Sequence, residues 1–529
     1  MKSVYFKIGI LTFTLFLFLL PISRSIAFRQ NDDWVHYLIV ESFTRNDFNL
    51  HPRIGSTFYV QGLAGMIFSN IFSIEQLPVL TLLVSVLNFG IFSLLLHKQI
   101  GLKLFTSVLL GFLLFLNPLH LYSVWGFMTE NYFMLFFLSA LYFILDFTRT
   151  GRGNSFLLSN LFILLDFFVK QYSLVFLAAL VLLMLVQKKY KLFVVQLGVL
   201  LLASAFYKFA FPLSPIMLSQ GPNLAGLLNY KYVFSHLLAF LIYLSAFTPP
   251  LILTIVGNFI ASVVKSKNIK GLVLFLLLSA FLFIGVTRLF DNKQTFTPLF
   301  PYLENVFSRQ GFFTVDLRGD SYSPVGSTTL FDVWSFVSLA GLTTLAVSLL
   351  LSFRNFLKSR QDFVPVKFPL IFLVLYLGFI LTVPHIYDRY LLPLVPCVVI
   401  LGSIFINRYK LESMARFKVL LFTSVLFLAF IGYQFSAEFI LRNNYVWSKS
   451  VDISTVKNVQ KDLINPGHSW RMVYNNGVEV SKWNYIFRYD SPATSPGDEY
   501  TWKLIETKKL AFPLSLYNNS FIYLYERGL

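Results

Sequence analysis

An apolar run fills residues 7–28, KIGILTFTLFLFLLPISRSIAF, in which only Lys7 and Arg24 are charged. A run of this length can cross the roughly 30 Å of hydrocarbon in a bilayer as an α-helix, the form that satisfies every backbone amide internally. It lacks a convincing small-residue cleavage site, and many similar runs follow it. We therefore interpret it as a retained membrane anchor rather than a secretory signal.

Runs of the same kind recur along the chain. Of the 529 residues, 56% are hydrophobic and 13% are charged, and the mean hydropathy is +0.68, which is more apolar surface than a soluble core could bury. The sequence predicts an all-α polytopic membrane protein with about 13 transmembrane helices, at roughly 7–28, 77–96, 104–121, 129–147, 155–170, 172–187, 192–211, 236–264, 271–290, 331–353, 368–384, 391–406 and 418–436. The single cysteine, Cys397, excludes an internal disulfide framework and argues against a Cys-based metal site.

The formal net charge of +18 is distributed in short basic clusters between apolar runs, a pattern that indicates membrane orientation rather than nucleic-acid binding. If the N-terminus is cytoplasmic, six such clusters lie on the cytoplasmic side, where Asp362 and Glu412 are about the only acids. We therefore predict a multi-pass protein of the plasma or inner membrane with a cytoplasmic N-terminus. The clusters are Lys98 and Lys103; Arg149 and Arg152; Lys188, Lys189 and Lys191; Lys265, Lys267 and Lys270; Arg354, Lys358, Arg360 and Lys367; and Arg408, Lys410, Arg416 and Lys418.

This orientation places three acid-containing segments outside. They are the loops at about 28–76 and 291–330 and the tail at 437–529, so that residues 1–436 form the transmembrane domain. The apolar cluster at 63–68 predicts a short helix in the membrane interface. Turn signals such as Asn465-Pro466-Gly467 and Ser495-Pro496-Gly497 predict a small extracytoplasmic α+β domain in the tail.

Two acids, Asp32 and Asp33, directly follow the first span. A carboxylate just above the outer surface could accept the proton of an attacking hydroxyl, and an adjacent pair disfavours joint ionisation. The alternative is that the two acids only mark the outer side, where they are soluble.

Two further charges are unusual for their positions. Glu130 enters the fourth span from outside, where an intramembrane acid is costly and suggests a function, although it could equally offset the helix dipole. Lys170 reaches the outer side against the general bias of basic residues. It could hold a phosphate, or it could pair with Asp166 four residues earlier.

A third group of candidates precedes the twelfth span, in HIYDRY at 385–390. Arg389 could offer a bidentate fork to a phosphate, or it could be an interfacial anchor with Asp388 as its counter-ion. His36, His51 and His385 are too scattered along the chain to indicate a metal site.

Five segments together resemble the GT-C superfamily of membrane glycosyltransferases, in the bacterial branch related to protein O-mannosyltransferases and the aminoarabinose transferase of lipid A (glycosyltransferase family 39-like). The resemblance covers roughly 7–410, but not the tail, and Gln171 departs from the small residue or proline common in relatives. The segments are NDDWVHYLIVESF (31–43), HPRIGSTFYVQGLAGMIF (51–68), MTENYFMLFFLSALYF (128–143), FFVKQYSLVFLAALVLLML (167–185) and DRYLLPLVP (388–396).

The resemblance implies an outer-face active site that uses a polyprenyl-phosphate-linked sugar as donor and a lipid, glycan or protein as acceptor. It assigns the general base to Asp32, with Asp33 as the adjacent acid, and donor-phosphate contacts to Lys170 and Arg389. The matched segments also contain the binding candidates Glu130, His51 and Tyr390. We expect an inverting displacement with no obligatory cofactor or metal, because the polyprenyl phosphate is already a good leaving group.

Other functions remain open. A transporter or flippase of lipid-linked sugars would have a similar size, but it tends to show paired Gly/Pro-interrupted spans and mid-membrane polar groups, which we do not find here. A polysaccharide polymerase or ligase normally centres on a large Arg-rich outer loop. The basic residues of the 291–330 loop are only Lys293, Arg309 and Arg318. A purely structural scaffold leaves Asp32, Glu130 and Lys170 without a shared explanation.

Overall fold

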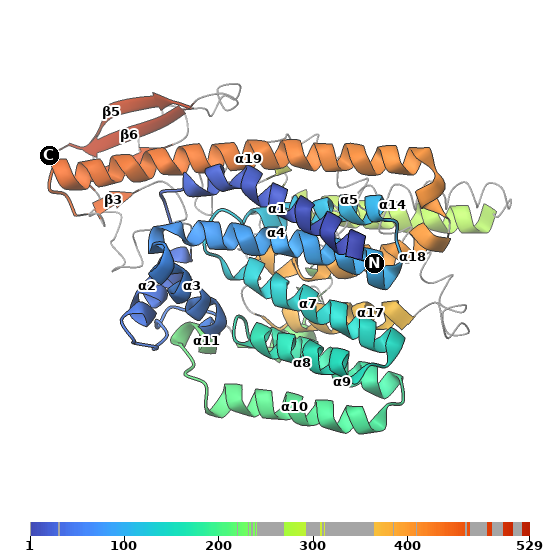
Figure 1. The fold of residues 1–529 in the computed structure, drawn as a ribbon. Helices are drawn as coiled ribbons and strands as arrows, with labels where there is room; N and C mark the ends of the chain where they lie inside the picture. Colours follow the sequence, from blue (N-terminus) through green and yellow to red (C-terminus); the bar gives the residue numbers. More distant parts are fainter. Residues whose placement is uncertain are drawn as a thin grey trace.

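The fold is mostly helical and carries a small C-terminal sheet (Figure 1). The computed structural model describes residues 2–29, 32–219, 221–230, 269–291, 364–383, 386–408 and 410–460, scattered positions between 232 and 240, and the short segments 307–308, 311–312, 463–465, 484–488, 501–510 and 521–528. The spans predicted near 236–264 and 331–353, most of the 291–330 loop, His385 and the predicted turns of the tail lie wholly or largely outside the described residues.

The predicted spans that fall within the described residues coincide with helices. Five of these helices are long and apolar enough to cross a membrane, in agreement with a membrane protein. They are α1 (Lys2–Arg24), α4 (Leu77–Leu95, continued by a short π-helix to Ile100), α7 (Thr129–Thr150), α10 (Tyr190–Phe209) and α19 (Ala415–Val456). The others are α5 (Leu104–Phe115), α8 (Gly153–Phe167), α9 (Ser173–Val186), α14 (Ile269–Asp291), α17 (Val364–Ile380) and α18 (Leu394–Arg408), with the short helices α6 (Pro118–Leu121) and α11 (Pro215–Ser219) between them.

Neighbouring helices pack side by side in the order α1, α4, α7, α8, α9 and α10, and α17 lies against α7 and α9. Short connections reverse the chain between α7 and α8 and between α9 and α10. Aromatic rings fill the interior: the Phe137 ring lies 5.0 Å from Phe176 and 5.0 Å from Phe372, which joins α7, α9 and α17. The protein core therefore consists of apolar side chains that, from the sequence alone, could equally be placed on the lipid-facing surface.

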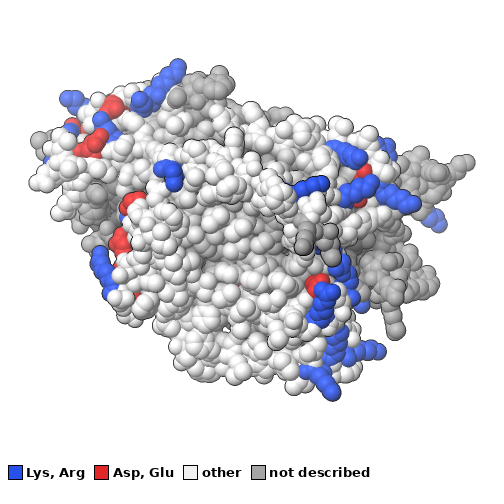
Figure 2. All heavy atoms as spheres, viewed as in Figure 1, with Lys and Arg blue, Asp and Glu red and all other residues white. Residues whose placement is uncertain are grey.

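Basic loops meet at one end of the helices. The Arg149 guanidinium donates to the Lys98 carbonyl at 2.8 Å, and the Lys103 amide donates to Glu412 at 2.8 Å. Figure 2 shows lysines and arginines gathered at this end, with a broad belt free of charged side chains between it and the opposite end. Among the described residues, the basic clusters around Lys98 and Lys103, around Arg149, and around Lys410 and Arg416 are thus neighbours in space, as a shared membrane side requires.

The opposite end carries two helices from the first loop, α2 (Asp33–Thr44) and α3 (Tyr59–Ile71). The sequence predicted a helix only around 63–68, and α3 contains that segment with Ile67, Ile71 and the following Phe72 exposed. The turn before α3 docks on the α8–α9 turn, because Phe58 donates its amide to the Val169 carbonyl at 3.1 Å. This contact brings together two of the segments that carry the resemblance, 51–68 and 167–185.

The tail begins as a continuation of a membrane helix. α19 runs as one helix through residue 436, the predicted boundary between the transmembrane domain and the tail, to Val456. A four-stranded sheet in the order β3 (Ile464–Asn465), β4 (Tyr485–Arg488), β6 (Phe521–Arg527) and β5 (Trp502–Lys509) packs on this extension. A separate hairpin pairs β1 (Phe307–Ser308) with β2 (Gly311–Phe312).

Gly65 provides a test of the packing of α3. A Cβ at this position would lie 2.8 Å from the Phe127 ring and 2.8 Å from a methyl of Val40, so Gly65→Val should destabilise the fold by about 1–3 kcal/mol. Thermal unfolding in detergent measures the change. Gly198→Val on α10 is the matched control, since nothing lies within 4 Å of its Cβ position. Equal thermal stability of both variants would contradict this packing.

Candidate active site

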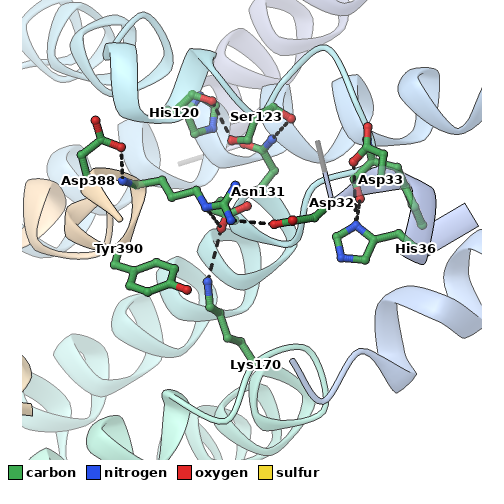
Figure 3. A network of polar contacts seen from close by, with 12 residues as sticks. Asp32, Asp33, His36, His120, Ser123, Asn131, Lys170, Asp388 and Tyr390 are labelled. Carbon is green, nitrogen blue, oxygen red and sulfur yellow. Dashed lines mark hydrogen bonds and ion pairs between the residues drawn. The ribbon is translucent and has the colours of Figure 1, made fainter. Parts of the chain in front are cut away.

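Four charged side chains from distant parts of the chain meet at the α2–α3 end of the helices (Figure 3). Asp32 precedes α2, and Glu130 lies in the first turn of α7. Lys170 occupies the turn between α8 and α9, and Arg389 lies in a short 3-10 helix, η4 (Asp388–Leu391). All four were candidates from the sequence, and the fold brings them into direct contact.

Glu130 is the centre of this cluster. Its Oε1 lies 3.3 Å from the Lys170 ammonium and 3.3 Å from the Arg389 Nε. A terminal guanidinium nitrogen of Arg389 is 2.6 Å from the Asp32 carboxylate. Two acids and two bases thus balance one another in charge, as burial requires.

The members of the cluster differ in their access to solvent. Glu130 is 4% exposed and Lys170 and Arg389 are 7% exposed, whereas the Asp32 side chain is 36% exposed. Burial disfavours the charged form of Arg389, but the carboxylates of Glu130 and Asp32 raise its pKa well above the ordinary value. Asp32 is therefore the member that an incoming molecule can reach directly.

Local backbone contacts fix the two cations. The Lys170 amide donates to the Asp166 carbonyl at 2.8 Å in the turn that follows α8, and the Lys170 ammonium lies 3.3 Å from Glu130. Among the described residues the ion-pair partner of Lys170 is therefore Glu130, on another helix, and not Asp166. The Arg389 amide donates to the Asp388 carboxylate at 2.9 Å, so Asp388 holds the η4 backbone while the guanidinium extends to Asp32 and Glu130.

Tyrosines line the cations. The Lys170 ammonium lies 4.5 Å from the ring centre of Tyr390 and 5.1 Å from that of Tyr172, and the Arg389 guanidinium lies 4.8 Å from the ring centre of Tyr387. Tyr390, a sequence candidate, is thus part of the cluster. Tyr172 and Tyr387 were not predicted, although each lies two residues from a candidate cation.

Asp33 points away from Asp32 and is 1% exposed. Its carboxylate accepts a hydrogen bond from the Phe127 amide at 2.9 Å. His36 and Gln61 both donate to the Phe127 carbonyl, at 3.0 and 2.9 Å. α2 and α3 therefore bind the backbone N–H and C=O of one residue, Phe127, just before α7, which sets the position of Asp32 relative to Glu130.

A buried polar layer lies behind Glu130. Asn131 donates to the Ser123 carbonyl at 2.8 Å, Asn88 donates to the Asn131 carbonyl at 3.0 Å, and the Ser123 hydroxyl donates to the His120 carbonyl at 2.9 Å. These contacts join His120, Ser123 and Asn131 (Figure 3) and hold the turn that precedes Glu130 in the sequence. Sequence reasoning missed this layer because isolated Asn, Ser and His residues give no periodic signal.

The hydrogen bond of His51 lies within its own turn and not in the cluster around Glu130. The His51 ring accepts from the Arg53 amide at 3.2 Å, and burial and Arg53 lower the pKa of the imidazole. Among the described residues, no hydrogen bond or ion pair joins His51 to the cluster around Glu130.

Comparison with known proteins gives no family. No family model, no curated protein and no solved structure matches this chain significantly. Its function is therefore inferred from its own residues.

Replacing Glu130 tests the central ion pairs. Glu130→Gln leaves two buried cations without their shared carboxylate and should cost about 3–5 kcal/mol of stability, measured by unfolding in detergent. Adding Lys170→Met should recover part of the loss by removing one of these cations. The control is Glu75→Gln, because Glu75 is 63% exposed and its pair with Arg29 contributes at most about 1 kcal/mol. A Glu130→Gln protein as stable as the control would contradict the arrangement.

Proposed function

We propose that the protein is a membrane glycosyltransferase that moves a sugar from a polyprenyl-phosphate donor to an acceptor hydroxyl. The observation that carries this proposal is a partly exposed carboxylate, Asp32, paired with the buried Arg389, which shares Glu130 with the buried Lys170 at the end of apolar helices. Such a site can accept a proton on one side and bind an anionic lipid headgroup on the other.

In the proposed reaction, Asp32 takes the proton of the acceptor hydroxyl while that oxygen attacks the anomeric carbon. The bond from the anomeric carbon to the phosphate oxygen breaks, and the polyprenyl phosphate leaves with the electron pair. A single displacement inverts the anomeric centre. The exposure of Asp32 favours it for the base role, and the burial of Asp33 against Phe127 favours a positioning role for that residue.

Lys170 and Arg389 suit the donor phosphate because charge develops on the departing oxygen and buried cations offset it strongly. Without donor, both cations are occupied by Glu130, and Arg389 is also paired with Asp32. A phosphate that takes the guanidinium therefore releases the Asp32 carboxylate to act as base. Tyr172, Tyr387 and Tyr390 provide an aromatic wall for the first isoprene units beside the phosphate.

The charge distribution supports an extracytoplasmic site. The basic loops lie at the end opposite Asp32, and positively charged loops favour the cytoplasmic side. The apolar face of α3, with Ile67 and Ile71 exposed, suits an interfacial helix on the outer leaflet. The resemblance of the segments around Asp32, Glu130, Lys170 and Arg389 to the GT-C superfamily points to the same reaction and fold.

Asp32→Asn should lower the turnover number by about 10²–10⁴-fold, the usual contribution of a general base. The assay incorporates purified protein into liposomes with synthetic polyprenyl-phosphate mannose or pentose, adds membrane-derived lipid, glycan and protein acceptors, and measures sugar transfer and polyprenyl phosphate release. Asp33→Asn is the matched control: its side-chain oxygen can still accept from Phe127, so it should retain activity within about tenfold of wild type.

Full activity of Asp32→Asn would remove Asp32 from the base role. Movement of the intact donor across the bilayer without sugar transfer would instead identify a flippase.

A further inference from the structure

Residues 25–29 follow α1 and precede Asp32 in the sequence, and this linker is bound to the extension of α19. The Asn444 side chain makes two hydrogen bonds to this linker: it accepts from the Ala27 amide at 2.8 Å and donates to the Ser25 carbonyl at 2.7 Å. One amide group thus pairs with two backbone groups a few residues before Asp32. A polar side chain more than 400 positions away in the sequence fixes the linker backbone.

Aromatic contacts surround this pair of hydrogen bonds. The Phe28 ring lies 5.1 Å from Phe439, and the Trp34 ring lies 5.4 Å from Trp447. The contacts of the α19 extension therefore flank Asp32 in the sequence, at Phe28 before it and at Trp34 after it.

The C-terminal sheet holds the extension in turn. Val446 and Ile453 of α19 pack with Phe487 and Leu524 of the sheet in one buried cluster. Lys449 lies 2.5 Å from Glu506 on β5. The sheet and the extension thus form one unit whose contact with the helices includes the linker.

We infer that this C-terminal unit positions the catalytic base, with Asn444 as the positioning residue that holds the backbone at Ser25 and Ala27, upstream of Asp32. The inference rests on the proposed function and adds a role for the tail. In the proposed reaction Arg389 passes from Asp32 to the donor phosphate, so Asp32 loses its contact with Arg389 when it must act. The contacts at Asn444, Phe439 and Trp447 then remain to hold Asp32 at the acceptor hydroxyl.

The test compares Asn444→Ala with Ser448→Ala in the liposome transfer assay. Asn444→Ala should lower the turnover number by about 10–100-fold, the effect of a small misplacement of a reacting group. The donor KM should stay the same, because Lys170 and Arg389 are untouched. Ser448→Ala should match wild type, since in the described part of the chain that exposed hydroxyl bonds only to the Tyr445 carbonyl of its own helix. An unchanged turnover number for Asn444→Ala, or a change confined to the acceptor KM, would overturn the inference.

A second measurement tests the positioning without the reaction. With Cys397→Ser removing the single cysteine, spin labels at Arg45→Cys and Asp452→Cys, both at exposed positions, report the distance between α2 and α19. Asn444→Ala should broaden this distance distribution, and Ser448→Ala should not. If the wild-type protein transfers no sugar, the proposed function fails, but the distance still tests whether Asn444 fixes the position of α2 relative to α19. An unchanged distance distribution in Asn444→Ala would refute the positioning role of Asn444 whether or not sugar transfer occurs.

Discussion

The ion pairs of Glu130 are the interaction on which the site depends. A lone carboxylate in the first turn of an apolar helix is costly to bury, and Glu130 at 4% exposure is compatible with the fold because Lys170 and Arg389 both lie 3.3 Å from it. Each cation in turn needs that carboxylate. The cluster therefore ties α7, the α8–α9 turn and η4 to one another, and through Arg389 it extends to Asp32.

Much of the architecture could be predicted, because it follows from the separation of apolar segments from charged ones. Long apolar runs become helices, and basic loops gather at one end. Glu130 and Lys170 could also be predicted as site residues, because each breaks a rule: an acid begins an apolar helix, and a lysine lies on the acidic side. Their pairing with each other could not be predicted, because Asp166, four residues before Lys170, was an equally good partner by sequence. Only the fold shows that the carboxylate next to Lys170 is that of Glu130.

The resemblance singled out Asp32 over Asp33 as the base, but the physical reason for the difference required the fold. The two residues are chemically identical and adjacent, and only the direction of the helix start sends Asp33 to the Phe127 amide and Asp32 to Arg389. Asn444 gave no signal in the sequence, because its hydrogen bonds join residues more than 400 positions apart. The long α19 was divided in the prediction because its second half is polar, although helical continuity does not require an apolar sequence.

The central claim is that Arg389 exchanges Asp32 for a lipid phosphate. A structure of the full chain determined by electron cryomicroscopy with bound polyprenyl phosphate tests it most directly. The account predicts a phosphate in contact with both Lys170 and Arg389, with the 2.6 Å pair between Arg389 and Asp32 opened and Asp32 still on its linker beside α19. A phosphate bound elsewhere on the protein, with the Arg389–Asp32 pair intact, would contradict it.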